Sequence, residues 1–451
     1  MKSIDSIAAE LAGYDPQALS ADKVQLFLSK LVAPVTEVET VTLFEALGRV
    51  LAHDLISPIS VPPHDNSAMD GFAFDGAQLA SQTPLTLKVV GTALAGKAWQ
   101  GQVQQGECLK IMTGAIMPPG LDTVVPQEFV TLTVQAEATW VTVPAHLLVP
   151  GDNHRHRGED LMQGQPALRK GELLTPAALG LVASLGIETL QVLRKLRVAY
   201  FSTGDEILSL GEAPREGAVY DSNRYTAFGL LTRLGCEVVD LGVVRDEPAL
   251  LEAAFTRAAL TSDAIITSGG VSVGEADYTK TMMKKLGDVA FWRIAMRPGR
   301  PMAVGHILRA KLASSPYASS ASSYAINSES TPSGSAILFG LPGNPVAVMV
   351  TFLAFVRPAL LQMMGCTAAA PPLLKAHSAV VIRKKAGRTE YQRGTVSTLP
   401  DGSLQVKTTG NQGSGVLSSM VQANGLIVLH HSQGDVAPGD EVDVMMFDGA
   451  I

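Results

Sequence analysis

The sequence predicts a multidomain protein that combines one α/β domain with β-rich domains. A chain of 451 residues is too long for a single compact core. Strand-like and helix-like segments alternate between residues 194 and 367, whereas short strand-like runs with Gly and Pro turns dominate residues 57–162 and 371–451. We therefore expect four domains, namely a three-layer α/β domain, an inserted β-rich domain, a small helical linker domain and a C-terminal β barrel.

The linker domain is expected to be discontinuous, formed by residues 1–56 and 163–193. Apolar side chains recur at helical spacing between residues 21 and 53, which predicts two short helices there. A further helix is predicted in TPAALGLVASLG. Residues 57–162 lie between these two segments and contain runs such as LTLKVVGTAL and TWVTVP, which predict the inserted β-rich domain.

In the α/β domain, the segments LRVAYFSTG and DAIITSGG read as buried strands that end in glycine turns. Helical segments separate the strands, so the strands should be parallel, and ligands should bind at their carboxyl ends. This rule places Thr203 to Glu206, Asp246 and Ser268 to Asp277 on one rim. The Ser-rich residues 314–335 are expected to form a flexible surface insertion rather than a functional lid.

Composition excludes several classes of protein. The net charge of -7 provides no global basic field for nucleic acid. Three widely separated cysteines form neither a disulfide framework nor a paired metal site. The N-terminus lacks the apolar core of a signal peptide, and the longest apolar runs, such as residues 346–356, are too short to span a bilayer. We expect a soluble cytoplasmic protein with no nucleic-acid or membrane partner.

Two glycine-bearing loops on the rim are candidate phosphate-binding sites. SGGVSVGEADYTK follows a strand and precedes a predicted helix, so its backbone N–H groups and the helix dipole favour an anion. FSTGDEI repeats the arrangement, although Asp205 or Glu206 could merely cap a turn, and the first loop could be a tight turn without a ligand. The predicted binding residues are Ser202, Thr203, Gly204, Asp205, Ser268, Gly269, Gly270, Val271, Ser272 and Gly274.

Two further loops admit both a binding and a structural interpretation. In YDSNRYT, the residues Asp221, Ser222 and Asn223 either contact the substrate or form a helix N-cap. In LPGNP, two prolines stiffen the loop and Gly343 permits an unusual turn, which would suit either a ligand or a rigid helix start. The candidate binding residues of this loop are Pro342, Gly343, Asn344 and Pro345.

Charged side chains suggest an oxyanion and a metal ion. Arg293, Arg297 and Arg300 occur in FWRIAMRPGRP, and guanidinium groups match tetrahedral oxyanions, although such a run is often only solvated surface. Scattered carboxylates offer the hard oxygen ligands that Mg²⁺ prefers. They are Asp70, Asp160, Glu206, Asp246 and Asp277. HExxH and paired CxxC motifs are absent from the sequence, so zinc proteolysis lacks support.

Taken together, these motifs resemble the molybdopterin molybdenumtransferase family, called MoeA in bacteria and represented by the gephyrin E domain. The resembling stretches run in order along almost the whole chain. They are SAMDGFA, KIMTGAIMPPGLDTVV, RGEDL, FSTGDE, YDSNRY, SGGVSVGEADYTK, AMRPGRPMAVG, LPGNPVAVMVTF, YQRG and NQGSG.

The resemblance implies an elongated homodimer with a molybdopterin-binding-type α/β domain, in which the inserted domain reaches the partner's site. It implies an Mg²⁺-dependent transferase that inserts molybdate into adenylylated molybdopterin and releases AMP. Asp70, Thr113 and Asp160 would be catalytic residues of the inserted domain, and Glu206, Asp246 and Asp277 those of the α/β domain. Asp246 and Asp277 would hold the metal. The molybdate end would involve Arg293, Arg297, Pro298, Arg300, Arg393 and Ser414.

One departure concerns positions 293, 297 and 300, where this chain has arginine and the family often has lysine. Arginine keeps the charge but is planar and bulkier, so the preference between molybdate and tungstate is left open. Two alternative functions are also carried forward, a molybdopterin adenylyltransferase and a non-catalytic dimeric scaffold of the gephyrin type. Other cofactor-biosynthesis proteins and molybdoenzyme acceptors are further candidate partners.

Overall fold

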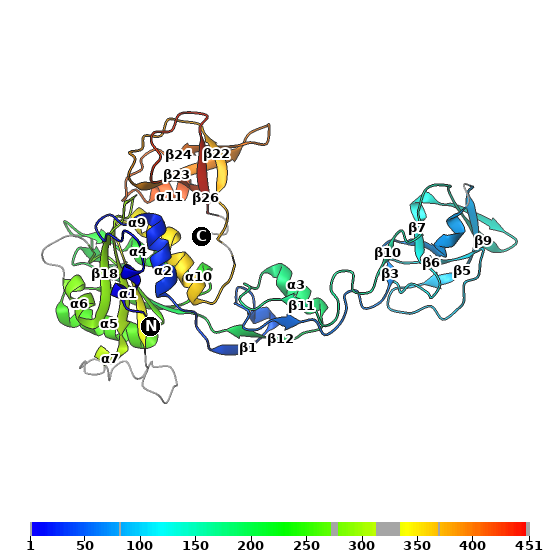
Figure 1. Ribbon diagram of the computed structural model, residues 1–451, viewed down its shortest axis with the longest axis horizontal. Coiled ribbons are helices and arrows are strands. Elements are labelled where there is room, and N and C mark those ends of the chain that lie inside the picture. Colours follow the sequence, from blue (N-terminus) through cyan, green and yellow to red (C-terminus); the bar gives the residue numbers. More distant parts are fainter. Residues whose placement is uncertain (1, 81–82, 272–277, 313–333, 369, 448–451) are drawn as a thin grey trace.

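The computed structural model describes residues 2–80, 83–271, 278–312, 334–368 and 370–447. The chain is elongated (Figure 1), with the α/β domain and the C-terminal barrel at one end, a slender linker in the middle and the inserted β domain at the far end. Most of the Ser-rich stretch predicted as a surface insertion, together with Ser272, Gly274 and Asp277, lies outside the described residues.

A six-stranded mixed sheet forms the centre of the α/β domain. Four neighbouring strands are parallel, the fifth runs antiparallel to the fourth, and the sixth, at the edge, runs antiparallel to the fifth. The order across the sheet is β16 (Glu237–Val244), β13 (Arg197–Thr203), β17 (Ala264–Ser268), β21 (Ser335–Leu341), β20 (Pro301–Leu308) and β18 (Gly287–Arg293). The parallel strands at the centre are almost fully buried, which explains their continuous apolar sequences.

Helices cover both faces of this sheet and create the predicted three layers. One face packs against α5 (Pro248–Thr261) and α6 (Tyr278–Leu286), with a core that includes Phe201, Phe255 and Met283. The other face packs against α4 (Ser222–Arg233) and a long helix. That helix consists of α9 (Pro345–Thr351), the π-helical segment η5 (Phe352–Val356) and α10 (Arg357–Met363).

The long helix is continuous over 19 residues, Pro345–Met363, and is apolar enough to cross a membrane by length and composition. Residues 346–356 were predicted to be too short to span a bilayer, but the helix that contains them is long enough to do so. However, 72% of its most apolar window is buried inside the protein. The helix is apolar because it lies in the main core of the α/β domain.

The first two helices belong to this core as well, and not to the linker as predicted. α1 (Ile4–Ala9) and α2 (Ala21–Leu31) share a buried cluster with the sheet and the long helix. The Phe27 ring packs edge-on against Trp292, with 4.9 Å between ring centroids. The apolar stripe of α2 thus finds its burial on the largest available apolar surface, and residues 4–32 add to the outer layer of the α/β domain.

The linker is formed by two chain crossings that pair with each other. β1 (Val38–Thr42) pairs with β12 (Thr189–Leu193), and β2 (Leu55–Ile56) pairs with β11 (Pro166–Leu168). α3 (Pro176–Ser184) covers a small core, as its sequence predicted. The second helix predicted before residue 53 does not form, because the chain there makes β1 and the 3-10 turn η1 (Leu43–Glu45).

The inserted domain is a twisted six-stranded sheet with an apolar core on each face. The strand order is β7 (Thr123–Pro126), β4 (Gly71–Phe74), β6 (Glu107–Ile111), β5 (Leu85–Ala93), β9 (Ala138–Val143) and β8 (Thr131–Gln135). A short ladder of β3 (Asn66–Ser67) with β10 (His154–Arg155) lies where the chain enters and leaves the domain.

The C-terminal domain is a closed five-stranded barrel, as predicted. Its strands are β22 (Leu374–Ser378), β23 (Thr389–Thr398), β24 (Leu404–Thr408), β25 (Gly425–Leu429) and β26 (Glu441–Met446), and the pairing of β23 with β25 closes the ring. A short strand of the α/β domain, β19 (Met296–Arg297), pairs with β23. This pairing attaches the barrel beside the arginine-rich turn.

Candidate active site

The predicted rim exists at the carboxyl ends of the central strands. β13 ends at Thr203 and β17 at Ser268, and the next residue, Gly269, donates its N–H to the Leu341 carbonyl at 3.2 Å. A Cβ on Gly269 would lie 2.5 Å from the Thr203 carbonyl oxygen, and its φ of +90° also favours glycine. Close packing of two strand ends therefore requires this glycine, and it brings the two predicted loops together.

A buried cluster of hydroxyl groups forms the floor beneath the rim. The Tyr200 hydroxyl donates to Ser268 Oγ at 2.7 Å, and Ser202 Oγ lies 3.1 Å from both. Burial raises the pKa of Tyr200, which keeps it a neutral donor. Ser202 and Ser268 were predicted to bind substrate, but their buried side chains bond to each other and to Tyr200. Tyr200 was missed because a tyrosine inside an apolar strand carries no motif.

Acidic side chains stand above this floor. The Asp246 N–H donates to Asp205 Oδ1 at 3.3 Å, and Thr279 Oγ1 donates to Asp246 Oδ1 at 3.3 Å. Glu206 follows Asp205 in the chain, and its carboxylate lies against Gly204, where an added Cβ would come within 2.5 Å of it. Asp205, Glu206 and Asp246 thus gather on one side of the rim as predicted.

One buried oxygen on the rim has no protein partner among the described residues. Thr203 is 3% exposed, and its Oγ1 makes no hydrogen bond. An unsatisfied buried hydroxyl costs free energy, roughly 1–3 kcal/mol, unless a ligand or water completes it. The Thr203 hydroxyl and the neighbouring carboxylates together provide hard oxygen atoms of the kind that Mg²⁺ prefers as ligands.

The N-termini of two helices, α4 and α9, form the opposite side of the rim. Asp221 caps α4, since its Oδ1 accepts the Arg224 N–H at 3.1 Å, and Ser222 is the first residue of that helix. Asn223 Nδ2 donates to the Gly343 carbonyl at 2.7 Å, so α4 holds the LPGNP loop. The capping interpretation of Asp221 is therefore correct.

The LPGNP loop is a rigid start to the long helix, with Asn344 at the N-cap and Pro345 in the first turn. Gly343 has no left-handed φ, and a Cβ there would meet nothing within 4 Å. The expectation that Gly343 permits an unusual turn is therefore wrong. The following Val346 N–H donates to the Ser414 carbonyl at 3.1 Å, which ties the loop to the barrel segment NQGSG.

Two of the predicted oxyanion-binding arginines share a cavity of about 220 Å³ between the α/β domain and the barrel. Arg297 and Pro298 line one side, and Arg393 and Gln412 line the other. The pairing of β19 with β23 brings these residues together although they are distant in sequence. Among the described residues, neither guanidinium forms an ion pair with a carboxylate.

The Arg393 side chain is buried and hydrogen-bonded to the surrounding barrel. It is 1% exposed, its Nε donates to Ser419 Oγ at 2.9 Å, and its Nη2 donates to the Gly413 carbonyl at 3.0 Å. Burial, and then the charge of Arg297, lower the pKa of Arg393 to about 10. The group stays charged at neutral pH, so the cavity holds two like charges that an anion would stabilise.

The other two arginines lie elsewhere. Arg293 and Arg300 line a second cavity of about 450 Å³, together with Lys280 and Val271. The predicted molybdate cluster is thus divided between two cavities, because Arg297 turns toward the barrel whereas Arg293 and Arg300 flank β18 and β20. Val271, the last described residue of the glycine loop before residue 278, links the rim to this second cavity.

Of the three residues predicted for the inserted domain, Asp70 and Thr113 lie together. Asp70 Oδ1 accepts both the N–H and the hydroxyl of Thr113 at 2.7 Å. The Thr113 hydroxyl, and then its N–H, hold the pKa of Asp70 below its ordinary value. Asp160 is exposed and donates its N–H to the Val61 carbonyl at 3.1 Å. Within one chain the inserted domain, which carries Asp70 and Thr113, lies at the far end of the molecule from the α/β domain (Figure 1), and Asp160 lies on the connection between β10 and β11 that returns to the linker.

This arrangement of domains defines a known class of protein. The crystal structure of the molybdopterin biosynthesis moeA protein from Pyrococcus horikoshii OT3 superposes with a TM-score of 0.75 and 25% identity, covering 95% of this chain and 100% of that one. Three family descriptions match in order along the sequence. They are the MoeA N-terminal region (domain I and II) at residues 19–186, the probable molybdopterin binding domain at 199–362 and the MoeA C-terminal region (domain IV) at 375–447.

Curated relatives agree with this class over almost their whole length. The molybdopterin molybdenumtransferase of Haemophilus influenzae is 40% identical over 413 residues, which cover 91% of this chain and 94% of that protein. The protein of the same name from Nostoc is 34% identical over 415 residues, covering 91% and 88%. The chain belongs to the molybdopterin molybdenumtransferase family, a family of transferase enzymes.

Proposed function

We propose that this chain inserts molybdate into adenylylated molybdopterin, releasing AMP and forming molybdenum cofactor. The observation that carries the proposal is the cavity where Arg297 and Arg393 meet without a carboxylate partner among the described residues. Glu390 also lines this cavity of about 220 Å³, but its carboxylate pairs with Arg388 at 2.7 Å. The guanidinium groups of Arg297 and Arg393 are therefore left to suit a small tetrahedral dianion such as molybdate. The choice between molybdate and tungstate stays open.

The rim would bind the phosphate groups of the substrate. The backbone N–H of Gly270 can approach a phosphate oxygen closely because this residue has no side chain, and Thr203 Oγ1 can donate to the phosphate as well. Asp246 and Asp277 are the residues we propose to hold Mg²⁺, and the oxygen donors at Asp205, Asp246 and Thr203 fit that ion. When bound, Mg²⁺ supplies positive charge that offsets the repulsion between oxyanion and phosphates.

The step that releases AMP replaces one phosphorus–oxygen bond with another, whereas insertion itself exchanges molybdenum–oxygen bonds for bonds to the two sulfurs of molybdopterin, and the displaced oxygens leave as water. A water or a molybdate oxygen attacks a phosphorus of the pyrophosphate link, the bridging bond breaks, and AMP leaves. Both attacking oxygens remain candidates. Because Ser202 and Ser268 are buried and bonded to Tyr200, neither serves as a nucleophile. We therefore propose a direct displacement without a covalent enzyme intermediate.

The complete site would need two copies of the chain. The inserted domain, which carries Asp70 and Thr113, lies far from the α/β domain of its own chain (Figure 1), and a homodimer could place these residues and Asp160 over the partner's rim. We propose this homodimer, working in the cytoplasm, with proteins of cofactor biosynthesis and molybdoenzyme acceptors as its transient partners.

The test is molybdate-dependent release of AMP from adenylylated molybdopterin by purified protein. Asp246→Ala should lower this rate by roughly 10²-fold or more, because it removes a proposed metal ligand. Glu247→Ala is the matched control, since Glu247 is adjacent and makes no side-chain cap bond to α5. An unchanged rate in Asp246→Ala would remove that residue from the mechanism.

The same assay separates the two alternatives. Pyrophosphate production from ATP and molybdopterin would indicate an adenylyltransferase. The absence of both pyrophosphate production and AMP release would indicate a scaffold. The curated relatives that match this chain over nearly their full length are named molybdenumtransferases, which favours molybdate insertion. The acids gathered on the rim argue against pure scaffolding.

A further inference from the structure

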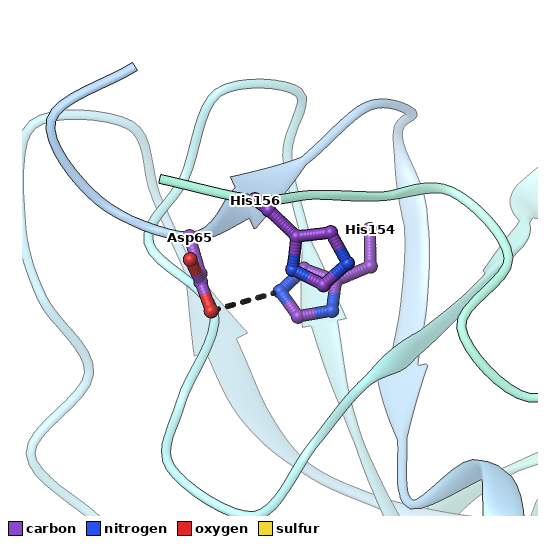
Figure 2. A group of neighbouring side chains, drawn as sticks. All are labelled: Asp65, His154 and His156. Atoms are coloured by element: carbon purple, nitrogen blue, oxygen red, sulfur yellow. Dashed lines mark ion pairs between the residues drawn. The ribbon is translucent and has the colours of Figure 1, made fainter. Parts of the chain in front are cut away.

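A cluster of two histidines and an aspartate lies in the inserted domain, apart from the residues used above. The candidate ligand atoms of Asp65, His154 and His156 all lie within 4.8 Å of one another. Figure 2 shows the carboxylate of Asp65 directed at the His154 ring, with the His156 ring beside it. The proposed reaction requires none of these three side chains.

The backbone holds the three residues together. In the antiparallel ladder, His154 lies opposite Ser67 and Arg155 opposite Asn66, so the next pair in register is His156 and Asp65. Alternate residues of a strand share one face, which places both histidines on the same side. The Asp65 carbonyl also accepts the Met117 N–H at 2.9 Å. The cluster therefore stands on a short but well-bonded piece of sheet.

The contact between His154 and Asp65 does not have the geometry of a hydrogen bond. His154 Nε2 and Asp65 Oδ2 are 3.3 Å apart, and the His154 side chain is only 8% exposed. Despite this proximity, the buried Nε2 forms no hydrogen bond with any described residue. Two ligand atoms bound tetrahedrally to zinc, at about 2.0–2.1 Å each, are separated by about 3.3–3.4 Å. The observed separation fits two ligands on one ion as well as it fits an ion pair between the two side chains.

The remaining groups are placed to complete such a site. Asp65 Oδ1 accepts the Arg157 N–H at 2.7 Å, which fixes the carboxylate and leaves Oδ2 facing His154. The His156 ring centroid is 4.5 Å from that of His154, and the side chain is exposed, so a rotation of the ring can bring it to the ion. The negative charge of the Asp65 carboxylate would repel an anion, so the cluster suits a cation instead.

We propose that Asp65, His154 and His156 bind a divalent transition-metal ion, with zinc as the best fit and water in the fourth position. Two imidazoles and one carboxylate suit zinc, whereas Mg²⁺ and Ca²⁺ prefer oxygen ligands alone. Asp65 precedes Asp70 by five residues, and His156 precedes Asp160 by four. The ion would therefore join the two segments that carry these acids, independently of the reaction proposed above.

The test is zinc binding by the full-length chain after treatment with a chelator. Metal analysis should give one zinc per chain, and titration against a competing chelator should give a dissociation constant at least ~100-fold weaker for His156→Gln. Zinc should also raise the melting temperature of the wild type but not of the variant. Excess Mg²⁺ should not displace the bound zinc.

His146→Asn is the matched control, because His146 is an exposed histidine of the same domain outside the cluster, and asparagine tolerates its φ of +60°. Circular dichroism checks that His156→Gln is folded, and Asp65→Asn offers a second variant if it is not. Equal zinc affinity in wild type and His156→Gln, or substoichiometric zinc in the wild type, would overturn the proposal. Loss of molybdate-dependent AMP release alone would bear only on the proposed function.

Discussion

The rim of the α/β domain and the acidic loops of the inserted domain carry two halves of the proposed site, but they are built differently. The rim rests on buried parallel strands, whose carboxyl ends must meet at one edge of the sheet. Asp70 instead lies exposed between β3 and β4 of the inserted domain, and Asp160 lies exposed on the connection from that domain back to the linker. In the proposed homodimer, a single chain would complete only the phosphate-binding half, and the other half would come from the second copy.

The strongest test of this division is complementation between subunits. Asp246→Ala and Asp70→Ala should each lower AMP release by roughly 10²-fold or more, because each removes one half of every site. When the two variants are co-expressed, random pairing should restore about a quarter of the wild-type activity, since half of the dimers contain one intact site. Activity is measured on the purified mixture.

The control is a mixture of Asp246→Ala with Glu206→Ala, two substitutions on the same rim. Heterodimers of this pair have one defect in each site and should stay inactive. If the Asp70 and Asp246 mixture were equally inactive, the two halves would not be shared between subunits.

The two arginine cavities provide the next test. Arg393→Ala should weaken molybdate binding by about 10-fold or more, and should cost about 1–3 kcal/mol of folding free energy because buried acceptors lose their donor. Arg300→Ala, which changes the second cavity, should alter molybdate affinity much less and leave stability nearly unchanged. Calorimetric titration and urea unfolding measure the two effects. A larger affinity loss in Arg300→Ala would move the oxyanion to the second cavity.

The glycines of the rim should respond unequally. Gly270→Ala should lower stability by about 1–3 kcal/mol and also reduce activity. Its φ is +64°, and the new Cβ would lie 2.5 Å from Thr279, the residue whose hydroxyl donates to Asp246. Gly343→Ala should leave stability almost unchanged, since its Cβ would enter open space. Thermal unfolding of both variants distinguishes a strained rim from a tolerant one.

The smallest effect is expected in the inserted domain at low pH. Because the folded pKa of Asp70 is below its ordinary 3.8, its stabilising effect is complete above that pH and is lost as pH falls through the lower folded pKa. Thr113→Val removes the first-ranked cause and should move the Asp70 pKa back toward 3.8. Carboxyl NMR titration follows this change. An unaltered Asp70 pKa in Thr113→Val would show that the backbone N–H alone is responsible.

Local patterns were sufficient wherever the structure follows from neighbouring residues. The alternation of strands and helices in residues 194–367 predicted the parallel sheet, and the glycines after Thr203 and Ser268 predicted the rim. The helical pattern before residue 53 failed in part, because Val38–Thr42 gains more from pairing with Thr189–Leu193 than from a second helix. Local spacing cannot express such a long-range partner.

By itself, the sequence determined the domain types, the acids and glycines of the rim and the family to which the chain belongs. Only the tertiary structure decided that Arg297 meets Arg393 while Arg293 and Arg300 lie in another cavity, and that two histidines join Asp65. Strand and helix periodicity is set by neighbouring residues, whereas contacts between distant segments depend on which surfaces bury each other. Those surfaces exist only after the domains have folded and packed.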